Sequence, residues 1–141
     1  MGTRAIYIFE DEHEEVWAYK HYDNYPRGAA DFIEDAKEYA WEFPRFEADE
    51  FAAAFVAANK NPKGGEVRLI HALFKDRDEM LDAHEWNDYY YVISYQPHHR
   101  DLWVEIWESR FESVHTHSRV LIDELTHTQM KEKYGERAVA V

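Results

Sequence analysis

Residues 1–26 read MGTRAIYIFEDEHEEVWAYKHYDNYP, and this stretch decides the fold. Two runs rich in β-branched and aromatic residues, 1–9 and 16–26, flank the acidic connection 10–15. Such a pattern predicts a β-hairpin that begins almost at the first residue. We expect its strands to lie centrally in a sheet and to place the turn 21–26 beside the start of a helix.

Two helices are predicted to follow, over residues 28–43 and 48–58. In the first segment, apolar residues recur with the spacing of a single helical face. Those residues are Ala29, Phe32, Ile33, Ala36, Tyr39, Ala40 and Phe43. Gly28 allows a permissive start, and Pro44 ends the helix because the residue before a proline disfavours helical angles. The second segment contains the alanine run 52–54, which has high helix propensity.

Residues 66–74 alternate as expected for a strand. One face would carry Val67, Leu69, His71 and Leu73. The charged connection 75–88 follows, and we expect a helical turn within it near Met80 and Leu81.

Residues 89–95 and 102–107 are predicted to form a second hairpin. Alternation along the two strands predicts one shared apolar row. Its members are Tyr91, Ile93, Leu102, Val104 and Ile106. Trp103 and Trp107 fall on the opposite side, so both faces of this hairpin are expected to be partly covered.

Residues 114–125 fit a strand, with Val120 and Ile122 inward, about as well as they fit a helix. Thr126 and Gln129 have the spacing of a capping box, which predicts that a short helix begins there. A strand over 114–125 followed by this helix is therefore favoured. We expect Gly135 to end the helix in a left-handed conformation and residues 136–141 to be frayed.

These elements predict a single α+β domain over residues 1–141. Its sheet is expected to be mainly antiparallel, with about five or six strands. Two consecutive helices would cover one face, and a short helix would end the chain.

The composition limits the classes of partner. The formal net charge is -13, with 29 acidic and 16 basic residues, which disfavours binding to a nucleic-acid backbone and favours basic partners. The chain has no cysteine, so disulfides and thiolate metal sites are excluded. No apolar run has the length of a membrane helix and no signal peptide is evident, so we expect a cytoplasmic protein that does not bind membranes. An aromatic content of 16% is also compatible with a homodimer interface.

The turn 21–26 is the first candidate site. His21, Asp23 and Tyr25 offer an imidazole, a carboxylate and a phenol close to a helix start, where free backbone amides favour an anion. Arg4 would complete such a pocket for a ligand or a partner. The alternative is a purely structural corner, because Asp and Asn favour turns for conformational reasons alone.

The second candidate is an acidic stripe on the first predicted helix. Its members are Asp31, Glu34, Asp35, Glu38 and Glu42. Like charges four residues apart do not stabilise a helix, so the stripe has no evident structural benefit. Together with Glu47, Asp49 and Glu50 it would dock on a basic partner; the alternative is an ordinary solvated face.

Histidine spacing gives a third candidate. On a strand, His115 and His117 point to the same side, which is a spacing used by metal sites. Nothing in the sequence fixes a third ligand, and a solvated strand face is the alternative. We find no glycine-rich phosphate loop, no serine-elbow motif and no zinc-protease motif, and otherwise expect no cofactor.

Residues 2–5, Gly-Thr-Arg-Ala, and residues 19–26, Tyr-Lys-His-Tyr-Asp-Asn-Tyr-Pro, resemble a group of small proteins encoded by bacteriophages and prophages. The pattern of that group is Gly-Thr-Arg-small, a strand, and Tyr-x-His-x-Asp-Gly-Tyr-Pro leading into a helix. Asn24 replaces the usual glycine, and asparagine also tolerates left-handed angles. The resemblance implies a phage or bacterial origin and an ordered N-terminal hairpin, and it carries no activity.

We therefore expect a non-enzymatic binding or inhibitory module that acts on a basic bacterial host protein. The acidic stripe or the turn 21–26 would make the contact. The alternative is a small-ligand-binding protein or a metal-dependent enzyme. It would use Arg4, His21, Asp23 and Tyr25, or the pair His115 and His117.

Overall fold

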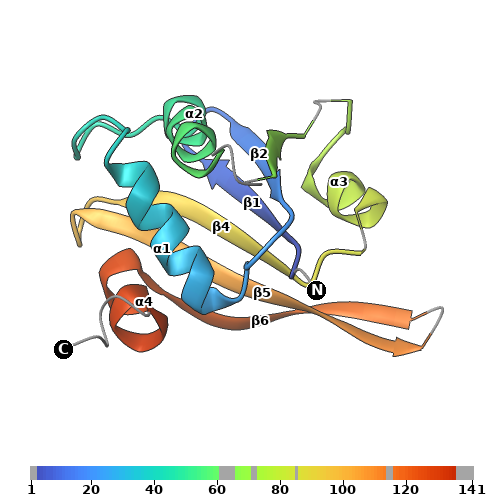
Figure 1. Ribbon diagram of the computed structural model, residues 1–141. Coiled ribbons are helices and arrows are strands. Elements are labelled where there is room, and N and C mark those ends of the chain that lie inside the picture. The colour runs from blue at the N-terminus through green and yellow to red at the C-terminus, as the bar shows by residue number, and fades with distance from the viewer. Residues whose placement is uncertain (1–2, 61–65, 71–72, 85, 114–115, 136–141) are drawn as a thin grey trace.

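A computed structural model describes residues 3–60, 66–70, 73–84, 86–113 and 116–135, and the side chains of 111–113 and 116–117 are outside that description. The chain forms one α+β domain around a six-stranded mixed sheet in the order β3-β2-β1-β4-β5-β6 (Figure 1). The strands are β1 Ala5–Glu10, β2 Glu15–Lys20, β3 Val67–Leu69, β4 Tyr89–Gln96, β5 Asp101–Ser113 and β6 Thr116–Thr126. The helices are α1 Pro26–Lys37, α2 Ala48–Asn59, α3 Arg77–Ala83 and α4 His127–Tyr134.

The predicted N-terminal hairpin is confirmed. β1 pairs with β2 in antiparallel register, with Ala5 opposite Lys20 and Glu10 opposite Glu15. On its other side β1 pairs with β4, and this is the parallel pair in an otherwise antiparallel sheet. β1 therefore lies in the interior of the sheet, where five of its six residues are buried.

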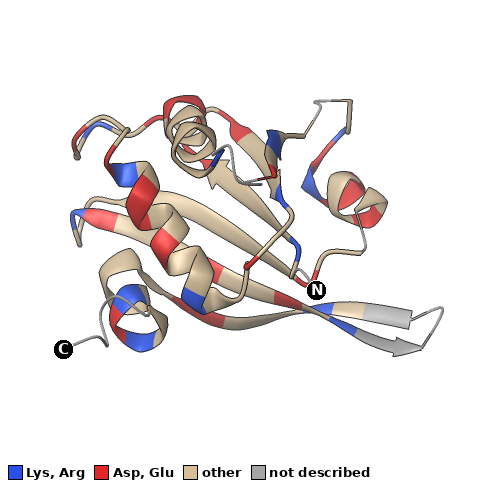
Figure 2. Cartoon of the chain, in the orientation of Figure 1, with Lys and Arg blue, Asp and Glu red and all other residues tan. Residues whose placement is uncertain are grey.

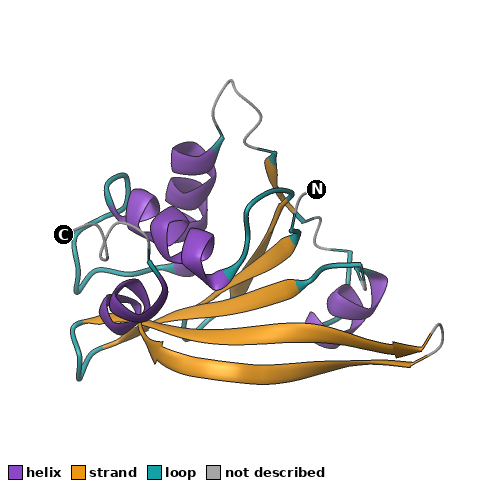
Figure 3. Ribbon diagram, turned by 60° about the horizontal axis from the view of Figure 1, so that its bottom comes forward, coloured by secondary structure: helices purple, strands orange, loops and turns teal. Residues whose placement is uncertain are grey.

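Helices α1, α2 and α4 cover one face of the sheet, and α3 covers part of the other face (Figures 1 and 3). Alternation along β1 divides its side chains between the two layers, because successive residues of a strand point to opposite faces. Tyr7 and Phe9 pack under α2 against Phe55 in the main core. Ile6 and Ile8 point the other way, into a smaller core that contains Met80 and Leu81 of α3, and also Tyr90 and Val92 of β4.

Helix α1 is shorter than predicted and shifted toward the N-terminus. It begins at Pro26, a residue suited to the first turn because the missing N–H needs no partner there. It ends at Lys37, so the expected boundaries at 28 and 43 are wrong. Apolar residues continue at helical spacing past Lys37 because Ala40 and Phe43 also pack on the core. These two residues lie in a loop and not in the helix. Tyr39, expected to face inward, is 64% exposed.

The strand predicted over 66–74 is much shorter. β3 contains three residues and is the edge strand beside β2, and only Val67 of its residues reaches the main core. Leu69 is 56% exposed and Leu73 is 82% exposed, so the expected shared apolar face is wrong, and His71 is outside the described residues. The helical turn expected near residues 80 and 81 is confirmed as α3, which Asp76 caps by accepting the N–H of Glu79.

The C-terminal segment forms a strand followed by a short helix, as predicted. β6 is a strand, but a bulge between its pairings with Ile106 and Trp107 leaves Ile122 37% exposed and not inward. α4 starts with the predicted capping box of Thr126 and Gln129. Gly135 has φ of −67°, so the expected left-handed cap is wrong. A side chain there would meet the carbonyl oxygen of Lys131 at 2.7 Å, so close backbone approach is what requires glycine.

Strands β5 and β6 continue past the end of β4 as a two-stranded ribbon (Figure 3). The shared apolar row predicted for β4 and β5 lies in the main core, as expected. Trp107 packs on the opposite face against Tyr90, with ring centroids 5.3 Å apart. None of the described helices has the length and apolar character needed to cross a membrane.

Candidate functional site

Asn24 is the structural centre of the turn 21–26. Its side-chain carbonyl accepts a hydrogen bond from the hydroxyl of Tyr7 at 2.6 Å, and its amide donates to the carbonyls of Thr3 and Lys20 at 2.8 and 2.9 Å. The hydroxyl of Tyr91 donates to its backbone carbonyl at 2.5 Å. Asn24 is fully buried, so its four polar contacts join β1, β2 and β4 beneath the start of α1.

The backbone reversal of this turn is made at Asp23, which has φ of 61°. In the phage-protein pattern, glycine stands at the position of Asn24, so the left-handed residue is expected at position 24. That expectation is wrong by one residue. Gly28 makes the close approach possible, because a Cβ there would lie 2.0 Å from the carbonyl oxygen of Asp23.

The four residues proposed to share a pocket do not share one. Arg4 lies on the face of the sheet that α3 covers, where it lines a hollow with Tyr19. His21 interacts with the same tyrosine, with Nδ1 2.6 Å from its hydroxyl, but it does not line that hollow. Tyr25 packs edge-on against Tyr89, whose ring lies on the opposite, helix-covered face. Asp23 is exposed, and it lines neither of the described hollows.

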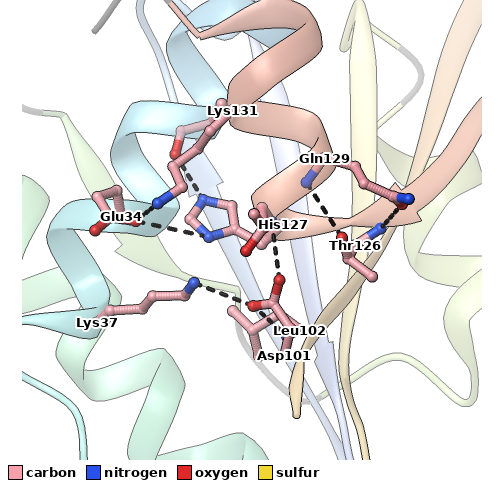
Figure 4. Close-up of polar contacts among 10 residues, drawn as sticks. Glu34, Lys37, Asp101, Leu102, Thr126, His127, Gln129 and Lys131 are labelled. Atoms are coloured by element: carbon pink, nitrogen blue, oxygen red, sulfur yellow. Dashed lines mark hydrogen bonds and ion pairs between the residues drawn. The ribbon is translucent and has the colours of Figure 1, made fainter. Parts of the chain in front are cut away.

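The acidic stripe is also redistributed by the fold. Glu34 turns toward α4, where its carboxylate pairs with Lys131 at 2.8 Å (Figure 4). Asp31 remains on α1, while Glu38 is only the helix cap and Glu42 lies in the loop that follows. A continuous acidic face over 31–42 is therefore not formed, because the helix ends at Lys37.

A buried polar cluster fills the contact between α1 and α4. The ring of His127 is fully buried, and its Nε2 donates to the carbonyl of Ala30 at 2.9 Å. That bond leaves Nδ1 as the unprotonated nitrogen, 3.8 Å from the carboxylate of Glu34 (Figure 4). Burial, aided by the charge of Lys37, lowers the pKa of His127 to about 4. The cluster holds two helices together around a neutral imidazole.

Asp101 stabilises the neighbouring start of α4. Burial alone would raise its pKa, but bonds from Thr128 and the charge of Lys37 hold that pKa below its ordinary value. The N–H of Thr128 lies 2.9 Å from one carboxylate oxygen, and Lys37 lies 3.2 Å from the other. These groups support the helix packing, and none of them lines either of the two hollows described below.

A hollow of about 1140 Å³ lies beside the β1–β2 and β4–β5 turns, at the opposite end of the sheet from the turn 21–26. The rings of Phe43, Phe46 and Tyr95 form its apolar wall. Phe43 and Tyr95 have ring centroids 5.1 Å apart, and Phe46 and Tyr95 have centroids 6.3 Å apart. Pro44 and Pro97 extend this wall, so the surface is rigid and aromatic.

The rim of the hollow is acidic. Asp11, Glu12 and Glu47 contribute three carboxylates to it, against a single guanidinium from Arg100, with His13 beside them. Acidic residues recur along the β1–β2 turn and the start of α2 (Figure 2). Their field makes this end of the molecule attractive to cations.

The carboxylates of Asp11, Glu12 and Glu47 differ in their contacts. Asp11 accepts the N–H of Ala48 at 2.8 Å and those of His13 and Glu14, and the Ala48 bond is the main reason that its pKa is lowered. Asp11 thus fixes the β1–β2 turn to the start of α2. Glu12 and Glu47 are exposed, and neither forms an ion pair within the part of the chain that the structure describes.

Sequence reasoning named Glu47 but missed the aromatic wall. Phe43 was assigned to a helix face, Tyr95 to a strand and Phe46 to no element, and nothing in their spacing joins them. One signal was available in the sequence, namely the aromatic residues on both sides of Pro44. The predicted helix, which ends at Phe43, would have placed Phe43 and Phe46 in different elements.

No group of three or more metal-ligating side chains occurs among the described residues. His115 lies outside the description and so does the side chain of His117, so the proposed metal pair stays a prediction. Comparison of the chain with protein-family models, with characterised proteins and with solved structures gives no match.

Proposed function

We propose that this chain is a non-enzymatic binding module of phage or prophage origin. It engages a bacterial protein in the host cytoplasm through a basic segment of that partner. The observation that carries the proposal is the aromatic hollow with an acidic rim, formed by Phe43, Phe46 and Tyr95 together with Glu12 and Glu47. The resemblance of the N-terminal residues to phage proteins supports the origin.

A lysine or arginine side chain suits this hollow in both of its parts. The long aliphatic stem packs on an apolar wall while the cation reaches carboxylates at the rim. Two cations of the chain itself already lie over aromatic rings of the loop 38–47. The guanidinium carbon of Arg45 lies 3.5 Å from the ring centroid of Trp41, and Nζ of Lys37 lies 5.7 Å from that of Phe43.

The net charge acts over a longer range. At -13 it accelerates the approach of a basic surface, and it repels nucleic acids, which compete for such surfaces. The hollow then supplies the short-range contacts that charge alone lacks. Where the partner's basic segment is also the segment with which that partner makes another contact, binding of the segment in the hollow blocks the other contact. In that case the module is inhibitory.

The proposal is tested with two labelled peptides of equal length. One carries lysine and arginine among small residues, and the other carries glutamine in their place. Fluorescence polarisation at low and high salt should show binding of the basic peptide alone, weakened by salt. Ring-proton shifts of Phe46 and Tyr95 in NMR spectra report whether the hollow is the contact.

Matched variants separate the site from the overall charge. Glu12→Gln with Glu47→Gln should weaken the basic peptide about tenfold, as expected for two charge contacts. Glu124→Gln with Glu132→Gln removes as many exposed charges on β6 and α4, and should have little effect. Phe46→Leu retains apolar volume and should weaken binding by about fivefold through loss of the ring.

Two results would refute the proposal. One is equal binding of the basic and glutamine peptides, and the other is equal weakening by the two double variants. If the basic peptide binds as expected, the bacterial partner is then captured from lysate. The double variant Glu12→Gln with Glu47→Gln serves as the negative control. A genuine partner is retained by the native protein and lost from that variant.

A further inference from the structure

A second hollow lies on the opposite face of the sheet. It is beside α3, whose place on that face is shown in Figure 1. Its volume is about 500 Å³, which is within the usual range of about 300 to 1000 Å³ for small-molecule sites. Residues from separate parts of the chain line it, and they include Arg4, Tyr19, Arg68, His84, Trp86 and Asn87.

Two arginines, Arg4 and Arg68, line this hollow. Arg77, Arg110 and Arg119 each pair with a carboxylate. Arg4 and Arg68 form no ion pair among the described residues, although acidic residues outnumber basic ones by 29 to 16. Two guanidiniums in one concavity, with no carboxylate partner in the part of the chain that the structure describes, are suited to an anion.

Both arginines lie close to Tyr19. The guanidinium carbon of Arg68 is 5.2 Å from the centroid of its ring. Burial raises the pKa of the Tyr19 phenol, and the charges of Arg4 and Arg68 oppose that rise, while the carboxylate of Glu66 adds to it. Both guanidinium charges therefore act on the same phenol at the wall of the hollow.

The remaining lining suits a planar ring. Trp86 is 72% exposed at the hollow, which is unusual for so large an apolar side chain and leaves its face open to stacking. Asn87 is only 6% exposed, and its amide donates to the carbonyl of His84 at 2.7 Å. Its side-chain carbonyl is buried and has no hydrogen-bond partner among the described residues.

We propose that this hollow binds a small planar ring that carries a phosphate monoester. The two guanidiniums match the charge of a phosphate dianion, whose second pKa of about 6 leaves it doubly ionised at neutral pH. The ring stacks on the exposed face of Trp86. This site lies on the other face from the acidic hollow, so it does not rest on the proposed function.

Isothermal titration with adenosine monophosphate tests the site, with adenosine and inorganic phosphate as separate probes. The complete probe should bind at least about tenfold more tightly than either part, because each part engages only one half of the lining. An aromatic carboxylate is a further probe and should bind more weakly than the dianion. Chemical shifts of the Trp86 indole, assigned with Trp86→Phe, should move on binding.

Arg4→Gln and Arg68→Gln should each reduce the affinity about tenfold, the loss expected for one charge-assisted contact. Arg68→Lys should restore part of that loss. Arg110→Gln removes a paired arginine elsewhere in the sheet and should leave the affinity unchanged. All the substituted side chains are exposed, so unchanged thermal unfolding is expected and confirms that each variant is folded.

Four results would overturn the inference. Equal affinity for inorganic phosphate and the nucleotide would mean an adventitious ion only. Equal affinity for the carboxylate and the phosphate ester would remove the preference for a dianion. Nucleotide binding that survives Arg4→Gln and Arg68→Gln, or no measurable binding at all, would exclude this hollow as the site.

Discussion

The hydroxyl of Tyr7 and the side-chain carbonyl of Asn24 lie 2.6 Å apart and form a buried hydrogen bond between β1 and the corner that precedes α1. Burial raises the pKa of Tyr7 well above its ordinary value, so the phenol stays a neutral donor. Asn24 also bonds to Thr3 and Lys20, which makes this one side chain the junction of the N-terminal hairpin.

Asn24→Ala should lower the free energy of unfolding by about 3 kcal/mol, because several buried groups lose their partner at once. Tyr7→Phe should cost about 1 to 2 kcal/mol, since it leaves one buried acceptor unpaired. Urea unfolding measures both. Tyr22→Phe, at an exposed hydroxyl, is the control and should be close to neutral. Additive losses in the double variant would contradict a direct Tyr7–Asn24 coupling.

Gly28→Ala should destabilise the protein by about 2 to 4 kcal/mol, because the new methyl group would meet the Asp23 carbonyl and push the corner away from α1. Asp23→Gly is the comparison. Its side chain is exposed and its φ of 61° suits glycine, so thermal unfolding should change little. If Gly28→Ala is as stable as the native protein, the close approach does not constrain the turn.

His127 should make stability depend on pH between about 6.5 and 4. Its pKa is about 4 in the folded protein and about 6.5 when unfolded, so in this window the unfolded state binds a proton that the folded state does not. The contribution is complete above pH 6.5 and falls by roughly 3 kcal/mol as the pH drops to 4. Glu34 and Asp101 oppose the lowering, while Lys37 adds to it.

Urea unfolding across this pH range, with an NMR titration of the imidazole, measures the effect. His127→Gln should flatten the pH dependence, whereas His98→Gln, at an exposed histidine in the β4–β5 turn, should preserve it. An imidazole titration midpoint near the ordinary value would show that the ring is not held neutral by burial.

Thr126→Ala should cost about 1 kcal/mol, the usual value of a helix N-cap. The threonine oxygen accepts the N–H of Gln129 at 3.1 Å, and the glutamine side chain accepts the N–H of Thr126 at 3.0 Å. Thr126→Ser keeps the hydroxyl and should recover most of the loss in thermal unfolding. Equal destabilisation by both substitutions would mean that the methyl packing, and not the cap, is what matters.

Local patterns alone were sufficient for the elements whose signals are local. The hairpin of β1 and β2, the helix α2 and the capping box of α4 each depend on neighbouring residues, so the sequence predicted them. The end of α1 did not follow from its pattern, because Phe43 contributes to the core from a loop through its contact with Tyr95. An aromatic residue that is buried from a loop can fall at the same sequence spacing as one that is buried from a helix. The spacing alone therefore does not show where the helix ends.

Sequence by itself determined the fold class, the charge, the absence of thiol chemistry and the order of most elements, since composition and short-range periodicity carry that information. The tertiary structure alone decided which side chains meet. It buried Asn24 between Tyr7 and Tyr91, dispersed Arg4, His21, Asp23 and Tyr25, and gathered the aromatic wall from a loop and a strand. Those outcomes depend on strand order and on where each helix stops, and both are set by packing between residues far apart in the chain.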